Sequence, residues 1–455
     1  MWGKGLLAAV FANIPLVLFC CSGALAFPVP TALAVLLTAA FFISLCFINI
    51  APIKNRYPNK RLYVLASGCE LLRVFSVSTA LSLLCHAVFL CAAFPAIFPW
   101  NGESAQILIK WLLCALATVL VEAVLFWNGM LRVYLTSVQL GVKHRVLAAL
   151  FGLIPGLNIY YLVKIVRICS AEVTAEAEKY QLDQTRADRE ICKTKYPILL
   201  VHGVFFRDSR YLNYWGRIPN ELMQNGATIY YGAQQSAATV EACGKELADT
   251  ICEIVRKTGC QKVNIIAHSK GGLDSRAAIS HFGAAPYVAS LTTVNTPHRG
   301  CIFAEYLLNK APEKLRTTLA AGYNAALMKL GDTAPDFLGA VTDLTASACA
   351  KFNEETPDAP EVLYESVMSY CKRARSGKFP LNVSYPVVRH FDGKNDGLVA
   401  VESAKWGSNF TLLEPVGNRG ISHGDMIDLN RENLRGFDVR EFYVSLVSSL
   451  RERGY

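Results

Sequence analysis

Four long apolar segments in the first third of the chain constrain its fold more than any other feature. They cover Leu6–Ala26, Thr31–Ile50, Phe75–Ile97 and Ile107–Trp127. A helix needs roughly 20 apolar residues to cross the hydrocarbon core of a bilayer. Helices and closed barrels alone satisfy their backbone polar groups there. We therefore predict an all-α transmembrane region with four spans.

Two features leave the number of spans open. A fifth segment, Val146–Val163, is shorter and is interrupted by Pro155 and Gly156, so it either spans, re-enters or lies in the interface. The first segment also has the pattern of a signal peptide, because Lys4 precedes the apolar run and Ala24-Leu25-Ala26 ends it.

The charge distribution indicates how the chain is oriented. Residues 1–170 hold 12 Lys or Arg side chains against 3 acidic ones, whereas residues 171–455 hold 33 of each, so the net charge of +9 lies in the first part. These basic residues stand between apolar runs, which indicates membrane topology and no nucleic-acid partner. The basic loops at 51–62 and 132–145 are expected in the cytoplasm. We predict a multi-pass protein of the cell membrane, with the following domain cytoplasmic for four spans and extracellular for five.

After the transmembrane region, residues 1–168, the sequence changes character. Residues 169–195 are polar and rich in Glu, Ala, Lys and Arg, as in a helical connector. From residue 196, apolar runs such as Ile198–Val201 and Val263–Ile266 alternate with helical periodicity, as in Val240–Arg256. Continuous apolar strands are typical of a parallel sheet that is covered on both faces. Residues 196–455 are therefore predicted to form an α/β domain with a mainly parallel sheet.

One segment of this domain carries a recognisable chemical motif. Ala267-His-Ser269-Lys-Gly-Gly272 follows a predicted strand and precedes the predicted helix Leu273–Phe282. Small residues beside a serine at such a sharp turn expose its hydroxyl, which is the nucleophile elbow of the α/β-hydrolase fold. An oxyanion hole requires two backbone N–H groups, one from the residue after the nucleophile and one from an earlier loop. We assign these groups to Lys270 and Val204.

A serine nucleophile needs a histidine base and an acid that orients it, and in this fold they follow in the order Ser, acid, His. His423 lies in a short polar loop downstream, whereas His390 lies in a predicted strand over Tyr385–Phe391. Asp396 precedes a Gly turn and is the candidate acid, with Asp392 as its rival. A purely structural Asn-Asp-Gly turn is the alternative interpretation of Asp396.

Further motifs follow one another from residue 196 to residue 430. They are Tyr196-Pro-Ile-Leu-Leu-Val-His-Gly203, Asn213-Tyr-Trp-Gly216, Gln224-Asn-Gly-Ala-Thr228, His268-Ser-Lys-Gly-Gly-Leu273, Val288-Ala-Ser-Leu-Thr-Thr293, Thr296-Pro-His-Arg-Gly300 and Asn395-Asp-Gly-Leu-Val399. With these motifs, most of this region resembles the secreted bacterial triacylglycerol lipases of the pseudomonad type. The resemblance implies Ser269 as nucleophile, Asp396 as acid and His423 as base. It also implies a helical lid within Asn309–Ala346. The apolar front third departs from this secreted family.

The resemblance also bears on calcium. Asp425 matches one calcium ligand of the family, but Cys371–Pro386, where the other ligand would lie, holds no acidic residue. Calcium takes about six oxygens and usually more than one carboxylate. The sequence therefore requires no cofactor and leaves a calcium ion at Asp425 open.

These features predict a membrane-anchored serine esterase or lipase that acts on lipid esters through an acyl-enzyme. A membrane acyltransferase or thioesterase using the same triad is the alternative, because only the acceptor or the leaving group would differ. Membrane lipids and an ester substrate are the expected partners, and no sequence feature indicates the oligomeric state.

Overall fold

The computed structural model describes residues 2–24, 31–55, 57–98, 102–204, 213–329 and 332–455. The chain forms two compact units, Met1–Leu182 and Asp183–Tyr455, which we call the helical unit and the catalytic unit. The helix α7, Leu157–Arg186, contains the boundary between them, and it holds most of the predicted connector.

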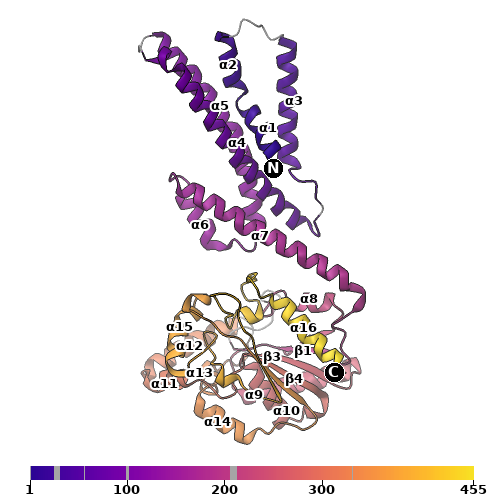
Figure 1. The fold of residues 1–455 in the computed structure, drawn as a ribbon. Coiled ribbons are helices and arrows are strands. Elements are labelled where there is room, and N and C mark those ends of the chain that lie inside the picture. Colours follow the sequence, from indigo (N-terminus) through magenta and orange to yellow (C-terminus); the bar gives the residue numbers. More distant parts are fainter. Residues whose placement is uncertain (1, 25–30, 56, 99–101, 205–212, 330–331) are drawn as a thin grey trace. The chain divides into compact units, whose positions relative to one another are not determined.

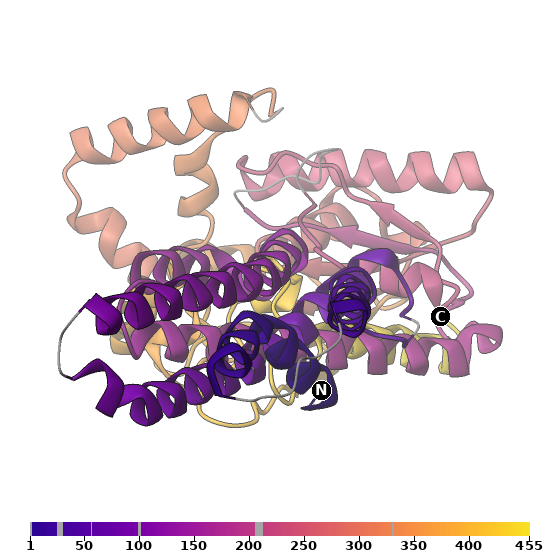
Figure 2. The ribbon, with the colours of Figure 1, turned by 90° about the horizontal axis from the view of Figure 1, so that it is seen from above.

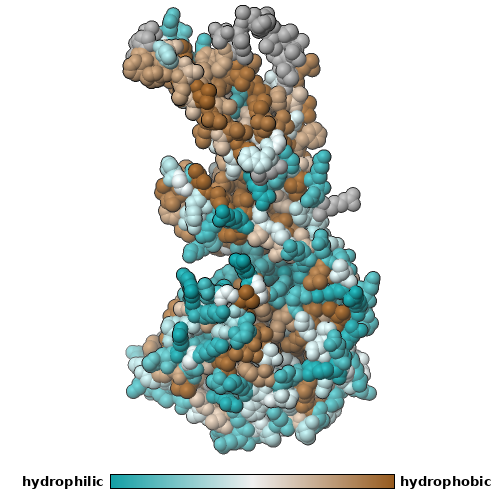
Figure 3. All heavy atoms as spheres, viewed as in Figure 1, coloured by the Kyte–Doolittle hydropathy of each residue, from teal (hydrophilic) through white to brown (hydrophobic). Residues whose placement is uncertain are grey.

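The helical unit is built of helices whose outward side chains are mainly apolar. Figure 3 shows this unit largely in brown, in contrast to the mostly teal catalytic unit. Helices α4 and α5 lie side by side along much of their length (Figure 1). The helices before α7 are α1 (Trp2–Ala12), α2 (Ile14–Ala24), α3 (Thr31–Ile50), α4 (Lys60–Ile97), α5 (Gly102–Thr136) and α6 (Gly141–Phe151).

Two of the described helices, α4 and α5, are long and apolar enough to cross a membrane. A third candidate is the pair formed by α1 and the first part of α2, which is bent by 54°. Pro15 follows this break, and a proline there lacks an N–H group and clashes with the preceding turn. Helix α3 includes a shorter apolar stretch, Thr38–Ile50, and residues 25–30 of the first predicted span lie outside the described residues. The segment Val146–Val163 covers the end of α6, a break and the start of α7.

Polar side chains are buried between the helices of this unit. The carboxylate of Glu122 on α5 accepts hydrogen bonds from Ser78 at 2.5 Å and Thr79 at 3.0 Å, both on α4. Ser82 extends the network to Asn13, at the break between α1 and α2, with a 2.7 Å hydrogen bond. Unpaired polar groups are costly in an apolar environment, so these side chains are stable here only when they pair with one another. Their hydrogen bonds link α4 and α5 to the break between α1 and α2.

The catalytic unit is organised around a six-stranded sheet in which all neighbouring strands are parallel (Figure 1). The strand order is β2-β1-β3-β4-β5-β6. Because the strands are parallel, their carboxyl ends meet at one edge of the sheet. The strands are β1 (Ile198–Val201), β2 (Ile229–Tyr231), β3 (Val263–His268), β4 (Val288–Val294), β5 (Leu363–Met368) and β6 (Asn409–Leu412).

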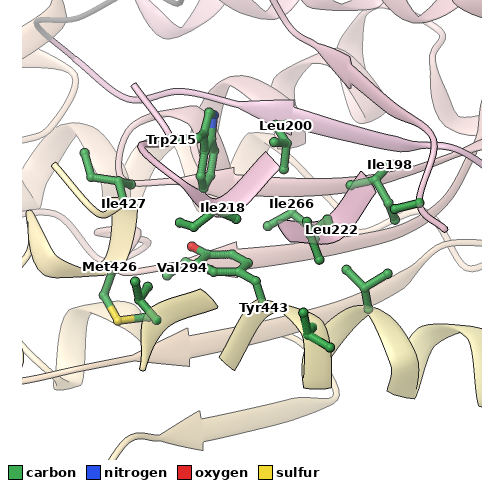
Figure 4. Packing of buried hydrophobic residues seen from close by; sticks show 14 of the residues in the cluster. Ile198, Leu200, Trp215, Ile218, Leu222, Ile266, Val294, Met426, Ile427 and Tyr443 are labelled. Atoms are coloured by element: carbon green, nitrogen blue, oxygen red, sulfur yellow. The ribbon is translucent and has the colours of Figure 1, made fainter. Parts of the chain in front are cut away.

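Helices cover both faces of this sheet. Successive side chains of a strand point to opposite faces, so alternate residues pack into two different cores. Ile198 and Leu200 pack into a core with Trp215 and with Tyr443 of α16 (Figure 4). Leu199 and Val201 face the opposite core, which includes residues of α9 and α10. Each fully buried Leu, Ile or Val contributes about 1.5–3 kcal/mol to folding. The helices of the unit are α8 (Ile218–Gln224), α9 (Val240–Thr258), α10 (Gly271–His281), α11 (Ile302–Lys310), α12 (Glu313–Lys329), α13 (Phe337–Thr342), α14 (Ala346–Glu355), α15 (Leu381–Asp392) and α16 (Val439–Glu452).

This architecture confirms the predicted α/β-hydrolase fold behind an apolar, all-helical region. The predicted strand over Tyr385–Phe391 was wrong, because these residues belong to helix α15. Tyr385 and Val388 are its buried residues, and their three-residue spacing places them on one helix face. The β-branched and aromatic composition of the segment had suggested a strand instead.

The segment predicted to hold a lid contains helices α12 and α13 and the end of α11. In Figure 2 these orange helices extend away from the sheet as an open arch. Among the residues of α12, Ala320 and Leu327 alone are buried. Leu315 and Leu319 are 51% and 52% exposed, so the helix presents apolar side chains to its surroundings.

Candidate active site

Ser269 lies in the sharp turn between β3 and α10. Its φ of 55° is in the left-handed region, which non-glycine residues rarely adopt outside strained functional turns. The turn is held by hydrogen bonds from the Ser269 N–H to the Val294 carbonyl at 3.0 Å and from the Thr296 hydroxyl to the Ser269 carbonyl at 2.7 Å. A Cβ atom at Gly272 would overlap the side chain of Thr296, so the tight turn requires a glycine there.

The loop after β1 packs directly against this turn. A Cβ atom on Gly203 would come within 2.8 Å of the Ser269 Cβ atom. The Gly203 N–H donates to the Tyr214 hydroxyl at 2.9 Å, which fixes this part of the backbone. Val204, the predicted oxyanion donor, is buried, and residues 205–212 after it lie outside the described residues. The second predicted donor, Lys270, follows the nucleophile at the start of α10, and its side chain forms a buried ion pair with Asp274 at 2.6 Å.

His423 and Asp396 are brought together from two different loops. Nδ1 of His423 lies 2.7 Å from Oδ2 of Asp396, and the His423 N–H donates to the Asp396 carbonyl at 3.0 Å. The Asp396 carboxylate is fully buried and accepts further hydrogen bonds from the Leu398 and Val399 N–H groups and from the Asn295 side-chain amide. These donors stabilise its charge and orient Oδ2 toward the imidazole.

His268 directly precedes the nucleophile in the sequence, and its ring packs beside that of His423. Its ring centroid is 4.4 Å from that of His423, and its Nδ1 is 2.7 Å from the Tyr214 hydroxyl. Because Gly203 already donates to that hydroxyl oxygen, the phenol proton is available to Nδ1. Burial holds the pKa of His268 well below its usual value, and the neighbouring His423 adds to this effect. His268 is therefore a neutral ring at neutral pH. In the described contacts no hydrogen bond joins the Ser269 hydroxyl to His423, and such bonds often tighten only when substrate binds.

The rival acid and two other histidines of the catalytic unit lie in different surroundings. Asp392 accepts hydrogen bonds from the Ile302 and Phe303 N–H groups at 2.9 and 3.1 Å, so it caps the N-terminus of α11. His390 is exposed at the end of α15. His298 is buried, where it contacts Thr293 through a 2.9 Å hydrogen bond.

Three contributors to the site were not identified from the sequence. They are Asn295, Tyr214 and His268. Asn295 follows β4, and polar residues at the carboxyl ends of neighbouring parallel strands were a usable signal. The Tyr214 hydroxyl contacts His268, which lies 54 residues further along the sequence, and no local sequence pattern predicts such a contact.

The residues around Asp425 do not fit a calcium ion. Arg419 donates to both carboxylate oxygens of Asp425, at 2.7 and 3.1 Å, and Ser422 donates to Oδ2 through its N–H and hydroxyl groups. Arg419 also lies 3.3 Å from Glu432. Burial lowers the pKa of this guanidinium, but the two carboxylates outweigh that effect and the net pKa is raised. A permanent cation therefore already neutralises the carboxylate that calcium would need.

Comparisons with known proteins relate the chain to serine esterases and lipases. A protein-family model described as "Putative serine esterase (DUF676)" matches residues 199–335. A triacylglycerol lipase of Pseudarthrobacter phenanthrenivorans is 34% identical over 180 residues, which cover 36% of this chain and 55% of that lipase. The chain thus spans about half the length of that relative.

A triacylglycerol lipase of Pseudomonas fragi is matched over nearly its whole length. It is 31% identical over 296 residues, which cover 57% of this chain and 98% of that lipase. Among solved structures, the mature form of a Bacillus licheniformis lipase has a TM-score of 0.42 at 23% identity and covers 56% of this chain and 92% of its own. The match of this chain to 98% of the Pseudomonas fragi lipase establishes that the chain belongs to the bacterial triacylglycerol lipase family.

Proposed function

We propose that this protein is a membrane-anchored serine esterase that hydrolyses carboxylic esters of lipids. The observation that carries the proposal is the buried His423–Asp396 pair, whose imidazole lies 4.4 Å from the ring of His268. His268 directly precedes Ser269, whose backbone has the left-handed conformation of a nucleophile turn. The family relationship supports the same reaction class.

In the proposed mechanism, the Ser269 Oγ atom attacks the ester carbonyl carbon while Nε2 of His423 takes its proton. Asp396 holds the proton on Nδ1 of the resulting imidazolium. The Val204 and Lys270 N–H groups bind the oxyanion. Collapse of the tetrahedral intermediate expels the alcohol, which takes the proton from His423. Water then attacks the acyl-enzyme by the same steps and releases the carboxylic acid.

The substrate class follows from where the catalytic unit is anchored. Apolar helices long enough to cross a bilayer would hold the chain where esters with long acyl chains are concentrated. The exposed leucines of α12 add an apolar surface within the catalytic unit itself. We therefore propose acylglycerols or related lipid esters over small soluble esters, in a multi-pass membrane protein whose catalytic unit is cytoplasmic when four segments span.

The reaction is tested by hydrolysis of a chromogenic fatty-acyl ester by the detergent-solubilised full chain. Replacement Ser269→Ala is expected to reduce kcat by roughly a thousandfold or more. Ser445→Ala is the matched control, because Ser445 is an exposed serine on α16 of the same unit. Equal activity of Ser269→Ala and wild type would show that another residue is the nucleophile, and transfer of the acyl group to added alcohol in preference to water would favour an acyltransferase.

A further inference from the structure

The helical unit contains a cavity of about 510 Å³ that has no part in the proposed hydrolysis. It lies where the start of α1, the connection between α3 and α4, and parts of α4 and α7 meet. Its ionisable walls include Lys4, Lys54, Glu70 and Arg73. The space therefore has both charged and apolar walls, and it is large enough for a small charged group.

Positive charge exceeds negative charge around this cavity. Glu70 is shared, since its carboxylate lies 3.3 Å from the Lys4 ammonium group and 3.9 Å from the Arg73 guanidinium group. Arg73 also donates to the Ser170 hydroxyl at 2.5 Å. Lys54 is exposed and forms no ion pair with the residues that the structure describes. Three cations thus surround one carboxylate, and the side chains of Lys4 and Arg73 are each 40% exposed. An anion can reach them.

An exposed apolar surface on α3 borders the cavity. Ile50, next to the lining residue Ala51, is 72% exposed, and Phe47, three residues earlier on the same face of α3, is 68% exposed. Apolar side chains with this exposure are typical of helices that contact acyl chains. Basic pockets at the end of membrane helices are suited to the head groups of anionic lipids. A lipid held here would place its phosphate among the cations and its acyl chains along α3.

We propose that this cavity binds the phosphate group of an anionic membrane lipid. Soluble phosphate shares the same chemistry, but the adjoining apolar surface favours a phosphate that carries acyl chains. The site is separate from Ser269, so the proposal stands whether or not the hydrolase activity is found.

The test uses the full chain in a neutral detergent and follows lipid retention by native mass spectrometry. The probes are dioleoyl phosphatidylglycerol, dioleoyl phosphatidylcholine and inorganic phosphate. Wild type is expected to retain phosphatidylglycerol in preference to phosphatidylcholine, and excess inorganic phosphate is expected not to displace it. Equal retention of the two lipids, or displacement by phosphate alone, would overturn the lipid as the occupant.

The variants locate the site. Lys54→Glu should weaken retention of phosphatidylglycerol on the order of tenfold, whereas Lys54→Arg should preserve it. Lys143→Glu is the matched control, because it makes the same change of charge on exposed α6 outside the cavity. Lys54→Gln removes the charge without reversing it, which serves as the test if Lys54→Glu disturbs folding. It should reduce retention of phosphatidylglycerol less than Lys54→Glu does. Equal losses in Lys54→Glu and Lys143→Glu would mean that overall charge, and not this cavity, binds the lipid.

Discussion

At the scale of single residues, the Tyr214 hydroxyl connects Gly203, in the loop after β1, to His268, which lies beside the proposed base. It accepts from the Gly203 N–H and contacts Nδ1 of His268. Tyr214→Phe would leave a buried N–H unpaired, at a cost of about 1–3 kcal/mol in the free energy of unfolding. We expect kcat for a soluble ester to fall on the order of tenfold, less than when an oxyanion donor is deleted.

A matched control for this change lies in the same core. The Tyr443 hydroxyl is buried and makes no hydrogen bond with the described residues, and its ring packs against Trp215 at 5.9 Å. Tyr443→Phe should therefore leave kcat and stability nearly unchanged, as measured by the same ester assay and by thermal unfolding. Comparable effects from both substitutions would show that the aromatic packing matters and the Tyr214 hydrogen bonds do not.

Arg419 gives a second prediction at this scale. Because its guanidinium group neutralises Asp425, removing divalent metals with a chelator should change neither kcat nor the melting temperature. Arg419→Met should lower the free energy of unfolding by about 1–3 kcal/mol, because it leaves a buried carboxylate without its cation. A fall in melting temperature of the wild type on chelation, reversed by added calcium, would contradict this prediction.

At the scale of elements, helix α12 presents apolar residues that its own unit does not cover. Replacing both Leu315 and Leu319 by serine should slow hydrolysis of micellar long-chain esters on the order of tenfold, since less apolar surface is available at the interface. Hydrolysis of a soluble short-chain ester should be unchanged. Met223→Ser on α8 is the control, because Met223 is a similarly exposed apolar residue, at 48%.

Several strands and helices of the catalytic unit could be predicted from the sequence. Strands β1 and β3 and helices α9 and α10 follow patterns of apolar spacing that local sequence contains, and their predicted positions were confirmed within two residues. Helix α15 was missed because β-branched and aromatic residues outweighed its helical spacing. Asn295, a further partner of Asp396, was missed for another reason: it follows a strand and lies 101 residues away in the sequence, so its contact exists only after the sheet has formed.

At the scale of the whole molecule, buried histidines couple folding of the catalytic unit to pH. Burial holds the pKa values of His268 and His298 well below the unfolded value of 6.5. The unfolded chain therefore binds more protons than the folded one below that pH. We expect stability to be fully present above about pH 6.5 and to be lost as pH falls toward the folded pKa values. Thermal unfolding of the full chain across this range measures the slope, which His298→Gln should reduce; a melting temperature that rises on acidification would contradict the prediction.

The order of elements along the chain has a consequence for biosynthesis. The apolar helices precede the catalytic unit, and His423 comes after β6, the last strand of the sheet. A nascent chain whose apolar helices enter a bilayer, as proposed, thus carries Ser269 long before the ribosome has added its proposed base. The proposed triad predicts that such an intermediate is inert toward the surrounding lipid, and that ester cleavage begins only when the C-terminal strand and its loop have docked.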